Sequence, residues 1–518
     1  MSRSLNRRVF LASSTAVASG VALRTASAAQ ASTTPRVPDI QVREALEDPT
    51  EATLTEAVVL MRRGKLTSTT LTEAYLDRIE RYDGTYQAYA EVTADAALAA
   101  ARKADRGQGA RGVLRGIPLC VKDNYFTRGV PTRCNSSIFE DFVPDEDATA
   151  VARLKAAGAI VLGKGQMGPL ATTRATKPNG TVTTVNAWTP GDPGVDPGGS
   201  STGPACSVAG RMAASSIGTQ TGGSIVLPSN QQNLTGLKPT MGRVSIHGVI
   251  PLSFTRDHSG PLARDAMDAA LMLQVMAGPD AKDPRTLGLP AVPDLVRAAT
   301  PVLSRGGAVR MRRATRIGVP SDFLAAQKEL RTALLNQLDA IPGVVLVDIA
   351  YPADWTLLTG TFNAARLAER TEPFRHWLRE DPAKFGVSLL SWLQGLMLSG
   401  DEWITAQRAK NHLLREVLDG LMNRCDVLLQ TGPVPFDILG LPEIAFPIGF
   451  DAGGVPVGAI LGGQPYEEDR LLEVAAAYQA VTDWHTRRPT DPVPAAARLR
   501  AAIARPRLSA EEVATSSA

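Results

Sequence analysis

The 518-residue chain has few of the residues that would narrow its function at once. It carries four cysteines, five histidines, 5% aromatic residues and a formal net charge of only +3. Cys120, Cys134, Cys206 and Cys425 form no CxxC pair, so their spacing gives no zinc site. Basic residues are spread out, without a dense Lys/Arg run interleaved with aromatics, which argues against nucleic acid as a partner. The apolar run near the N-terminus is too short and too diluted by Ser and Gly to cross a bilayer.

The N-terminus has the layout of an export signal. Arg7 and Arg8 precede a moderately apolar run that extends to about Leu23, and Ala26-Ser27-Ala28 offers a small-residue cleavage site. The paired arginines indicate a twin-arginine-type signal over residues 1–28. We therefore expect a secreted or cell-envelope protein without stable membrane insertion. Export permits disulfides, and a Cys120–Cys134 bridge is possible but not favoured.

The rest of the chain predicts one large α/β domain. Residues 29–50 are rich in Ser, Thr and Pro and are interpreted as a linker, and residues 486–518 as a loosely ordered C-terminal tail. Between them, residues 51–485 show no internal linker. Helical periodicity is followed by an alternation of short apolar strands and helices, which is typical of layered α/β folds. Helices are predicted at 53–64, 68–83, 93–106, 147–158, 467–482 and throughout 322–422; strands are predicted at 117–121, 159–163, 215–218, 426–430, 444–450 and 456–461.

Ser224, in GTQTGGSIVLP (218–228), raises the question of a nucleophile. Two glycines precede it, but Val226 breaks the G-x-S-x-G elbow pattern. A nucleophilic serine needs a base. His247 and His258 are the nearest histidines, and a structural role is favoured for both. Lys122 is another option, because it ends the apolar run GIPLCV, where burial would lower the pKa of its amine. The alternative is a lysine that emerges into water at the end of a strand.

A second glycine/serine cluster, DPGGSSTGP (196–204), presents Ser200 or Ser201 on a tight loop. Glycines permit close backbone approach and positive φ angles. The glycines before Ser224 would also let backbone N–H groups point at a developing oxyanion. Either cluster taken alone is equally well explained as a turn.

Together these segments resemble the amidase signature family over roughly residues 50–485. The resemblance rests on the order and spacing of four motifs, with further matches at AGAIVLGK (157–164), DHSGPLAR (257–264) and LPEIAFPIGF…GVPVGAILGG (441–463). The four are GIPLCVKDN (116–124), PGGSSTGP (197–204), GTQTGGSIVLP (218–228) and GLKPTMGRVS (236–245). It implies a central mixed β-sheet covered by helices on both faces, in a single large domain.

By this resemblance, Ser224 is the nucleophile, Ser200 a bridging serine after a cis peptide, and Lys122 the terminal base of a Ser-Ser-Lys relay. The backbone N–H groups of Thr221, Gly222, Gly223 and Ser224 would form the oxyanion hole. The same resemblance argues against a phosphate-binding loop at GAIVLGKG (158–165). In addition, Gly165 stands where such a loop has the Ser or Thr that binds magnesium.

The chain departs from the family pattern around both serines. Gln220 and Val226 stand where Asp and Arg are common, which removes an ion pair as a whole and leaves no unpaired charge. Gln220 can still hydrogen-bond through its amide, so we expect a loop that is held differently and is not broken. Thr202 and Pro204 replace residues that are often Gly and Ser.

The expected function is an exported amidase that hydrolyses a small carboxylic amide and needs no cofactor and no metal. Alternatives are an ester hydrolase or acyl transferase with the same acyl-enzyme, the glutaminase component of a tRNA amidotransferase, and a non-catalytic binding protein on this fold. The signal argues against the amidotransferase, because its tRNA and partner proteins are cytoplasmic. Aromatic residues of the variable middle, such as Trp355, Phe362, Phe374, Trp377 and Trp392, are candidates for an apolar pocket, although core packing is favoured for them.

Overall fold

The computed structural model describes residues 46–494, apart from 177–182, 354 and 361–362, together with 37, 38, 40 and 42. The predicted signal (1–28) lies outside the described residues, as do most of the predicted linker and the chain after 494. Everything described belongs to the unit Pro35–Ala518.

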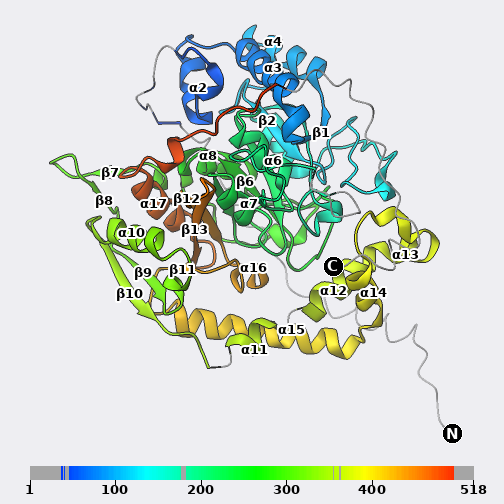
Figure 1. Ribbon diagram of the computed structural model, residues 1–518, viewed down its shortest axis with the longest axis vertical. Helices are drawn as coiled ribbons and strands as arrows, with labels where there is room; N and C mark the ends of the chain where they lie inside the picture. Colours follow the sequence, from blue (N-terminus) through cyan, green and yellow to red (C-terminus); the bar gives the residue numbers. More distant parts are fainter. Residues whose placement is uncertain are drawn as a thin grey trace, which may run out of the picture. The chain divides into compact units, whose positions relative to one another are not determined.

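An eleven-stranded mixed sheet forms the centre of this unit (Figure 1). Its order is β1-β3-β2-β4-β6-β5-β12-β13-β11-β9-β10. Parallel pairing joins β2 to β3 and β4, and β9 to β10 and β11; the other neighbours are antiparallel. The strands are β1 Tyr89–Val92, β2 Pro118–Lys122, β3 Ile160–Gly165, β4 Ser215–Gln220, β5 Thr235–Lys238, β6 His258–Ala263, β9 Thr315–Pro320, β10 Val344–Ile349, β11 Val427–Gln430, β12 Glu443–Phe450 and β13 Pro456–Gly463. A separate hairpin pairs β7 Val302–Leu303 with β8 Val309–Arg310.

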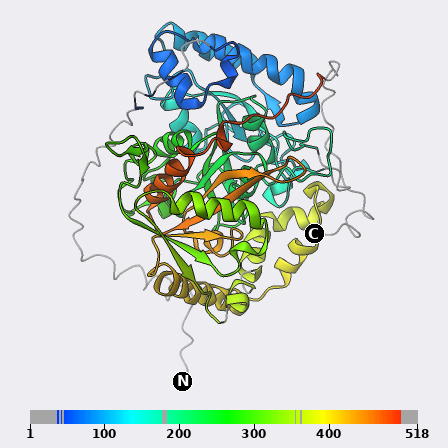
Figure 2. The same cartoon turned by 60° about the vertical axis from the view of Figure 1, so that its left-hand side comes forward.

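Helices flank the sheet, as predicted. In Figure 2, α10 lies in front of the strands β10 and β12 that it contacts. The helices are α2 Leu54–Arg62, α3 Ser68–Tyr86, α4 Ala94–Asp105, α5 Thr149–Ala156, α6 Thr202–Ala209, α7 Val226–Gln231, α8 Ala266–Met276, α9 Leu295–Ala298, α10 Lys328–Asp339, α11 Trp355–Gly360, α12 Asn363–Thr371, α13 Arg375–Glu380, α14 Leu390–Met397, α15 Gly400–Arg415, α16 Phe436–Leu439 and α17 Glu468–Gln479. Capping boxes begin two of them, Thr53 with Glu56 at α2 and Ser399 with Glu402 at α15.

The region 322–422 departs from its all-helical prediction, because it contains β10. This strand lies at the edge of the sheet, and most of its residues are partly exposed. The aromatic residues of this region fill cores. Phe374 and Trp392 are buried in one cluster, with Trp377 against it, and Trp355 packs on another. Phe362 lies outside the described residues.

The first part of the predicted C-terminal tail packs on the domain. Asp491 accepts hydrogen bonds from Arg78 and forms an ion pair with Arg211 at 2.7 Å. Arg488 lies 3.7 Å from Glu51. These contacts bring the described C-terminal end against α3 and the first turn of the domain.

The four cysteines are all buried and free, so the possible Cys120–Cys134 bridge does not form. No helix in the described ranges is long and apolar enough to cross a membrane.

Candidate active site

Lys122 is buried at the C-terminal end of β2 and does not emerge into water. Its side chain is 0% exposed. Its Nζ atom lies 2.9 Å from Ser200 Oγ, 2.9 Å from Thr219 Oγ1 and 3.4 Å from the Thr219 carbonyl oxygen. Burial lowers the pKa of Lys122 from 10.5 to about 7, although Cys134 and Asp257 act in the opposite direction. A large fraction of this amine is therefore neutral near neutral pH.

Two parallel neighbours of the sheet bring the site together. β2 pairs with β4 in parallel, so both strands end at the same edge. Lys122 is the last residue of β2, and the loop that carries Ser224 follows the end of β4. The motifs are about a hundred residues apart in the chain and adjacent in the fold.

The two serines of the loop before α6 have different hydrogen-bond partners. Ser200, which is 1% exposed, faces the amine of Lys122, and the Gly199–Ser200 peptide bond is cis. Ser201 donates its hydroxyl to the Thr219 carbonyl at 3.2 Å. The glycine/serine pattern alone left Ser200 and Ser201 as alternatives, and only Ser200 contacts Lys122 directly.

Ser224 lies in the turn between β4 and α7, and its side chain is partly exposed. Gly222 beside it is exposed, and Gly223 has a φ of +113°, a conformation that favours glycine. Thr221, at the start of this turn, donates its hydroxyl to Asp257 Oδ1. The turn thus combines an open face with a fixed backbone.

Gln220 holds this turn in place of the common aspartate. Its Oε1 atom accepts from the backbone N–H groups of Ile225 and Val226 at 3.0 and 3.1 Å. Its Nε2 atom donates to Glu443 Oε2 at 2.8 Å. Val226, where Arg is common, packs with Ala445 and Ile460 in a small apolar cluster. One neutral amide therefore fixes the loop, and the charged partner is replaced by apolar packing.

The histidines near this region bond elsewhere. His258 is buried with Nδ1 2.6 Å from the Arg256 carbonyl oxygen, and burial places its pKa well below 6.5. His247 lies 3.1 Å from Glu146. Both have the structural environment that the sequence favoured.

A second lysine, Lys164, is also buried. It lies in β3, whose sequence forms part of the GAIVLGKG segment that was compared with a phosphate-binding loop. It donates to the Tyr125 carbonyl and the Thr132 hydroxyl at 2.7 and 2.6 Å, and lies 3.5 Å from Asp123. It is thus occupied within the protein, in a regular strand and not in a loop.

Three residues around the site were given no role from the sequence. Thr219 contacts Lys122, Asn124 donates to Thr219 Oγ1 at 3.0 Å, and Asp257 binds the turn through Thr221. Each of the three lies within a motif that the sequence analysis recognised. Their position in these motifs was therefore the feature of the sequence that could have identified them. In the described part of the chain, no group of three His, Cys, Asp or Glu side chains could hold a metal ion.

Comparison with known proteins places this arrangement in a family. The model of the Amidase family matches residues 70–431. The chain belongs to the amidase family. Its relatives include a glutamyl-tRNA(Gln) amidotransferase component from Roseiflexus sp. (strain RS-1), which is 34% identical over 86% of this chain and 99% of that protein. The peptide amidase of Stenotrophomonas maltophilia superposes with a TM-score of 0.74 at 30% identity, covering 85% of this chain and 98% of that one. The resemblance and the fold drawn from the sequence are confirmed, and the chain is an amidase-family hydrolase.

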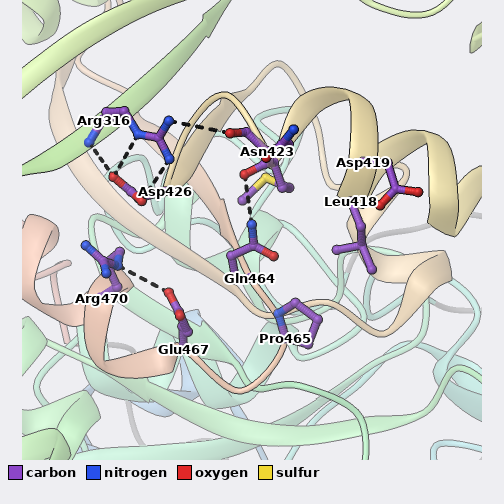
Figure 3. A pocket seen from close by; sticks show the side chains of 10 residues that line it. Arg316, Leu418, Asp419, Asn423, Asp426, Gln464, Pro465, Glu467 and Arg470 are labelled. Carbon is purple, nitrogen blue, oxygen red and sulfur yellow. Dashed lines mark hydrogen bonds and ion pairs between the residues drawn. The ribbon is translucent and has the colours of Figure 1, made fainter.

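A polar depression of about 720 Å³ lies away from these residues (Figure 3). It lies between the π-helical turn Glu416–Leu421 and the loop before α17. Its two arginines are paired, Arg316 with Asp426 and Arg470 with Glu467. None of the predicted site residues lines it.

Proposed function

We propose that the protein is an exported amidase that hydrolyses a carboxylic amide to an acid and an amine or ammonia. The observation that carries the proposal is the 2.9 Å contact between two buried groups, Lys122 Nζ and Ser200 Oγ, beside the turn that bears Ser224. A lysine with a pKa of about 7 is a competent base at neutral pH.

In the proposed mechanism, neutral Lys122 takes a proton from Ser200 while Ser200 takes one from Ser224. Ser224 Oγ then attacks the amide carbonyl and forms a tetrahedral oxyanion. The relay returns a proton to the leaving nitrogen as the C–N bond breaks, which leaves an ester on Ser224. Water, deprotonated through the same relay, hydrolyses this ester and restores the serine.

The N–H groups of Thr221, Gly222, Gly223 and Ser224 are proposed to bind the oxyanion. The φ of Gly223 and the bonds from Gln220 to the following residues support a turn with preset N–H directions. A preorganised donor of this kind contributes about 3 to 4 kcal/mol to transition-state stabilisation.

A second candidate follows from the names of the curated relatives, several of which are components of glutamyl-tRNA(Gln) amidotransferases. The activity would then be release of ammonia from glutamine for a partner. The predicted signal argues for the exported amidase over this candidate. Rapid turnover of glutamine, with little turnover of other amides, would reverse that preference. Added hydroxylamine tests transfer, because an acyl transferase would form the hydroxamate.

Export is part of the proposal and is tested separately. When residues 1–40 are fused to a reporter that is active only outside the cytoplasm, the reporter should be active. Replacing Arg7 and Arg8 together by lysine should abolish the reporter's activity. The N-terminal sequence of the exported protein should begin near Ala29. A reporter equally active with both substitutions would remove the twin-arginine route.

The central test is covalent labelling of the nucleophile. Incubation with a fluorophosphonate should add one adduct to the mature protein, seen by intact mass, and none to Ser224→Ala. Ser201→Ala is a matched control, because Ser201 lies next to Ser200 and bonds to main chain; it should still be labelled. Absence of an adduct on the wild type would favour the non-catalytic binding protein.

A further inference from the structure

A group of buried polar side chains adjoins the turn that bears Ser224, and we call it the polar cluster. It comprises Gln220 at the end of β4, Lys238 at the end of β5, Gln430 at the end of β11 and Glu443 at the start of β12. None of the four is more than 5% exposed. The proposed proton relay uses none of them, although Gln220 directly precedes the turn.

Glu443 lies at the centre of the polar cluster and is surrounded by donors. Its Oε2 atom accepts from Gln220 Nε2 at 2.8 Å, and its Oε1 atom accepts from Gln430 Nε2 at 3.3 Å. Lys238, its register partner across β5 and β12, places Nζ 3.7 Å from Oε2. Among side chains, only a carboxylate presents two acceptor oxygens and no donor. The surroundings of position 443 thus call for a carboxylate.

Glu443 also bears on the orientation of the Gln220 amide. The oxygen of this amide accepts from the backbone N–H groups of Ile225 and Val226, and its nitrogen donates to Glu443. A half-turn of the amide would aim its NH2 group at two donors and its oxygen at a carboxylate. Both contacts would be repulsive. The carboxylate and the two N–H groups therefore select the same orientation together.

The Gln220 side chain closes the turn from one end to the other. Gln220 precedes the turn, and the two residues whose N–H groups it accepts from come directly after Ser224. The segment 221–224 between these points contains the four N–H groups proposed to bind the oxyanion. An amide that rotates or loses its partner would release this closure, so the direction of those N–H groups depends on Glu443.

Stability alone explains the ion pair of the polar cluster poorly. Taking Lys238 and Glu443 out of water costs free energy, and apolar side chains of similar volume are often at least as stable. Burial raises the pKa of Glu443 and lowers that of Lys238, and the attraction between the two opposes both shifts. An apolar pair would, however, leave Nε2 of Gln220 buried without an acceptor. What the pair provides is a fixed partner for Gln220.

We propose that Glu443 is a positioning residue, whose carboxylate orients the Gln220 amide and thereby directs the N–H groups of residues 221–224 at the oxyanion. This inference rests on the proposed amidase function. Glu443 touches neither the substrate nor the reacting atoms. Its loss should therefore slow bond formation at Ser224 and leave the binding of the reactant nearly unchanged.

The first test exchanges the acid and the amide. Glu443→Gln puts an NH2 group among donors, and Gln220→Glu sets a second carboxylate against Glu443. In the double variant the carboxylate at position 220 accepts from both backbone N–H groups and from the amide at position 443. We expect each single variant to lower the maximal rate of fluorophosphonate labelling by about 10- to 100-fold, with little change in the half-saturating concentration. The double variant should regain about tenfold or more of that loss.

Labelling reads out the turn because Ser224 Oγ displaces fluoride while the phosphoryl oxygen of the reagent occupies the place of the oxyanion. Single variants that are labelled at the wild-type rate would overturn the proposal, as would a double variant no faster than the slower single one. Glu467→Gln is the matched control, since that side chain is 42% exposed in a surface pair with Arg470, and it should be labelled like the wild type.

The second test separates positioning from stability. Lys238→Met with Glu443→Leu fills the same space with an apolar pair and removes the acceptor of Gln220. We expect this variant to fold, as judged by circular dichroism and urea unfolding, and still to be labelled about tenfold or more slowly. A folded variant that is labelled at the wild-type rate contradicts the positioning role. Failure of the amidase function would appear separately, as a wild type that no fluorophosphonate labels.

Discussion

At the scale of single residues, the position of Lys122 decides what chemistry is available. The same lysine at a solvent-exposed strand end would be fully protonated at neutral pH and could not accept a proton. Here burial removes the water that stabilises the charged form, and Thr219 and Ser200 offer oxygens without a full negative charge. A carboxylate in either place would raise the pKa again.

The activity should therefore depend on pH through this amine. Since the neutral form is required, kcat/KM should rise with pH, with an apparent pKa of about 7, and level off above it. Below about pH 6 it should fall about tenfold per unit. The pH profile of hydrolysis measures this, with circular dichroism as a check that the fold persists. Lys122→Met, which keeps the volume without the base, should lose activity by about 1000-fold or more. A flat profile, or a variant with near wild-type turnover, would remove lysine from the relay.

Gln220 stands where Asp is common, and it still holds the turn that bears Ser224 through hydrogen bonds. The sequence identified the loss of both Asp and Arg and predicted a loop held differently. In the structure one amide accepts from two backbone N–H groups and donates to Glu443, while Val226 is packed among apolar side chains. Glu443 could not have been predicted as the partner, because it lies 223 residues away on β12.

At the scale of elements, the most predictable strands are those that consist of apolar runs. β2, β3, β11 and β12 are nearly continuous apolar runs, which is the pattern of strands covered on both sides. β5 and β6, which read TGLK and HSGPLA, contain Gly, Ser, Pro and charged residues, so no strand pattern marks them. Their burial comes from the neighbours that pair with them, and tertiary context of this kind is not local in the sequence.

The candidate site residues came from the sequence, and their surroundings did not. Lys122, Ser200 and Ser224 came from motifs whose spacing matched a family. The ion pair of Arg256 with Asp437 beside Gly222 did not, because the 253–257 segment and α16 meet only after folding. No periodicity or motif joins Arg256 to Asp437.

A close approach of two elements makes Gly218 a sensitive position. It lies in β4, and a Cβ atom there would be 2.6 Å from Ser201 Oγ and 2.8 Å from a methyl group of Leu262. Gly218→Ala should therefore displace the loop of Ser200 and Ser201 and lower kcat by about tenfold or more, with a destabilisation of about 1 to 3 kcal/mol. Turnover and urea unfolding measure the two effects.

Gly432→Ala serves as the matched control for this prediction, because nothing lies within 4 Å of its Cβ position. It should resemble the wild type in both measurements. Equal behaviour of the two variants would mean that the loop adapts without consequence for the relay.

At the scale of the whole molecule, Arg211 joins the beginning of the described domain to its end. It forms ion pairs with Glu51 and with Asp491, and Asp491 also binds Arg78 of α3. Burial would raise the pKa of Asp491, but the two arginines bring it below its ordinary value. The segment after α17 is thus tied down by charge as well as by packing.

Asp491→Asn should lower the free energy of unfolding by about 1 to 3 kcal/mol, since two partly buried guanidinium groups lose their counter-charge. Because the folded pKa is depressed, the difference from wild type should be complete at neutral pH and shrink as the pH falls below about 4. Thermal and urea unfolding across pH test both parts. Asp483→Asn, at a side chain 69% exposed in a 3.5 Å pair with Arg487, is the control and should change little.

The meeting of Glu51 and Asp491 on one guanidinium has a practical consequence for protein engineering. A short peptide could join these two places, and the chain could be reopened at Arg305 and Gly306 in the exposed turn between β7 and β8. Such a circular permutant would leave every strand of the central sheet intact and would present its new ends on a hairpin outside that sheet. The protein could then be tethered to a support through that hairpin, with the order of its elements along the chain changed and the residues of the candidate site left in place.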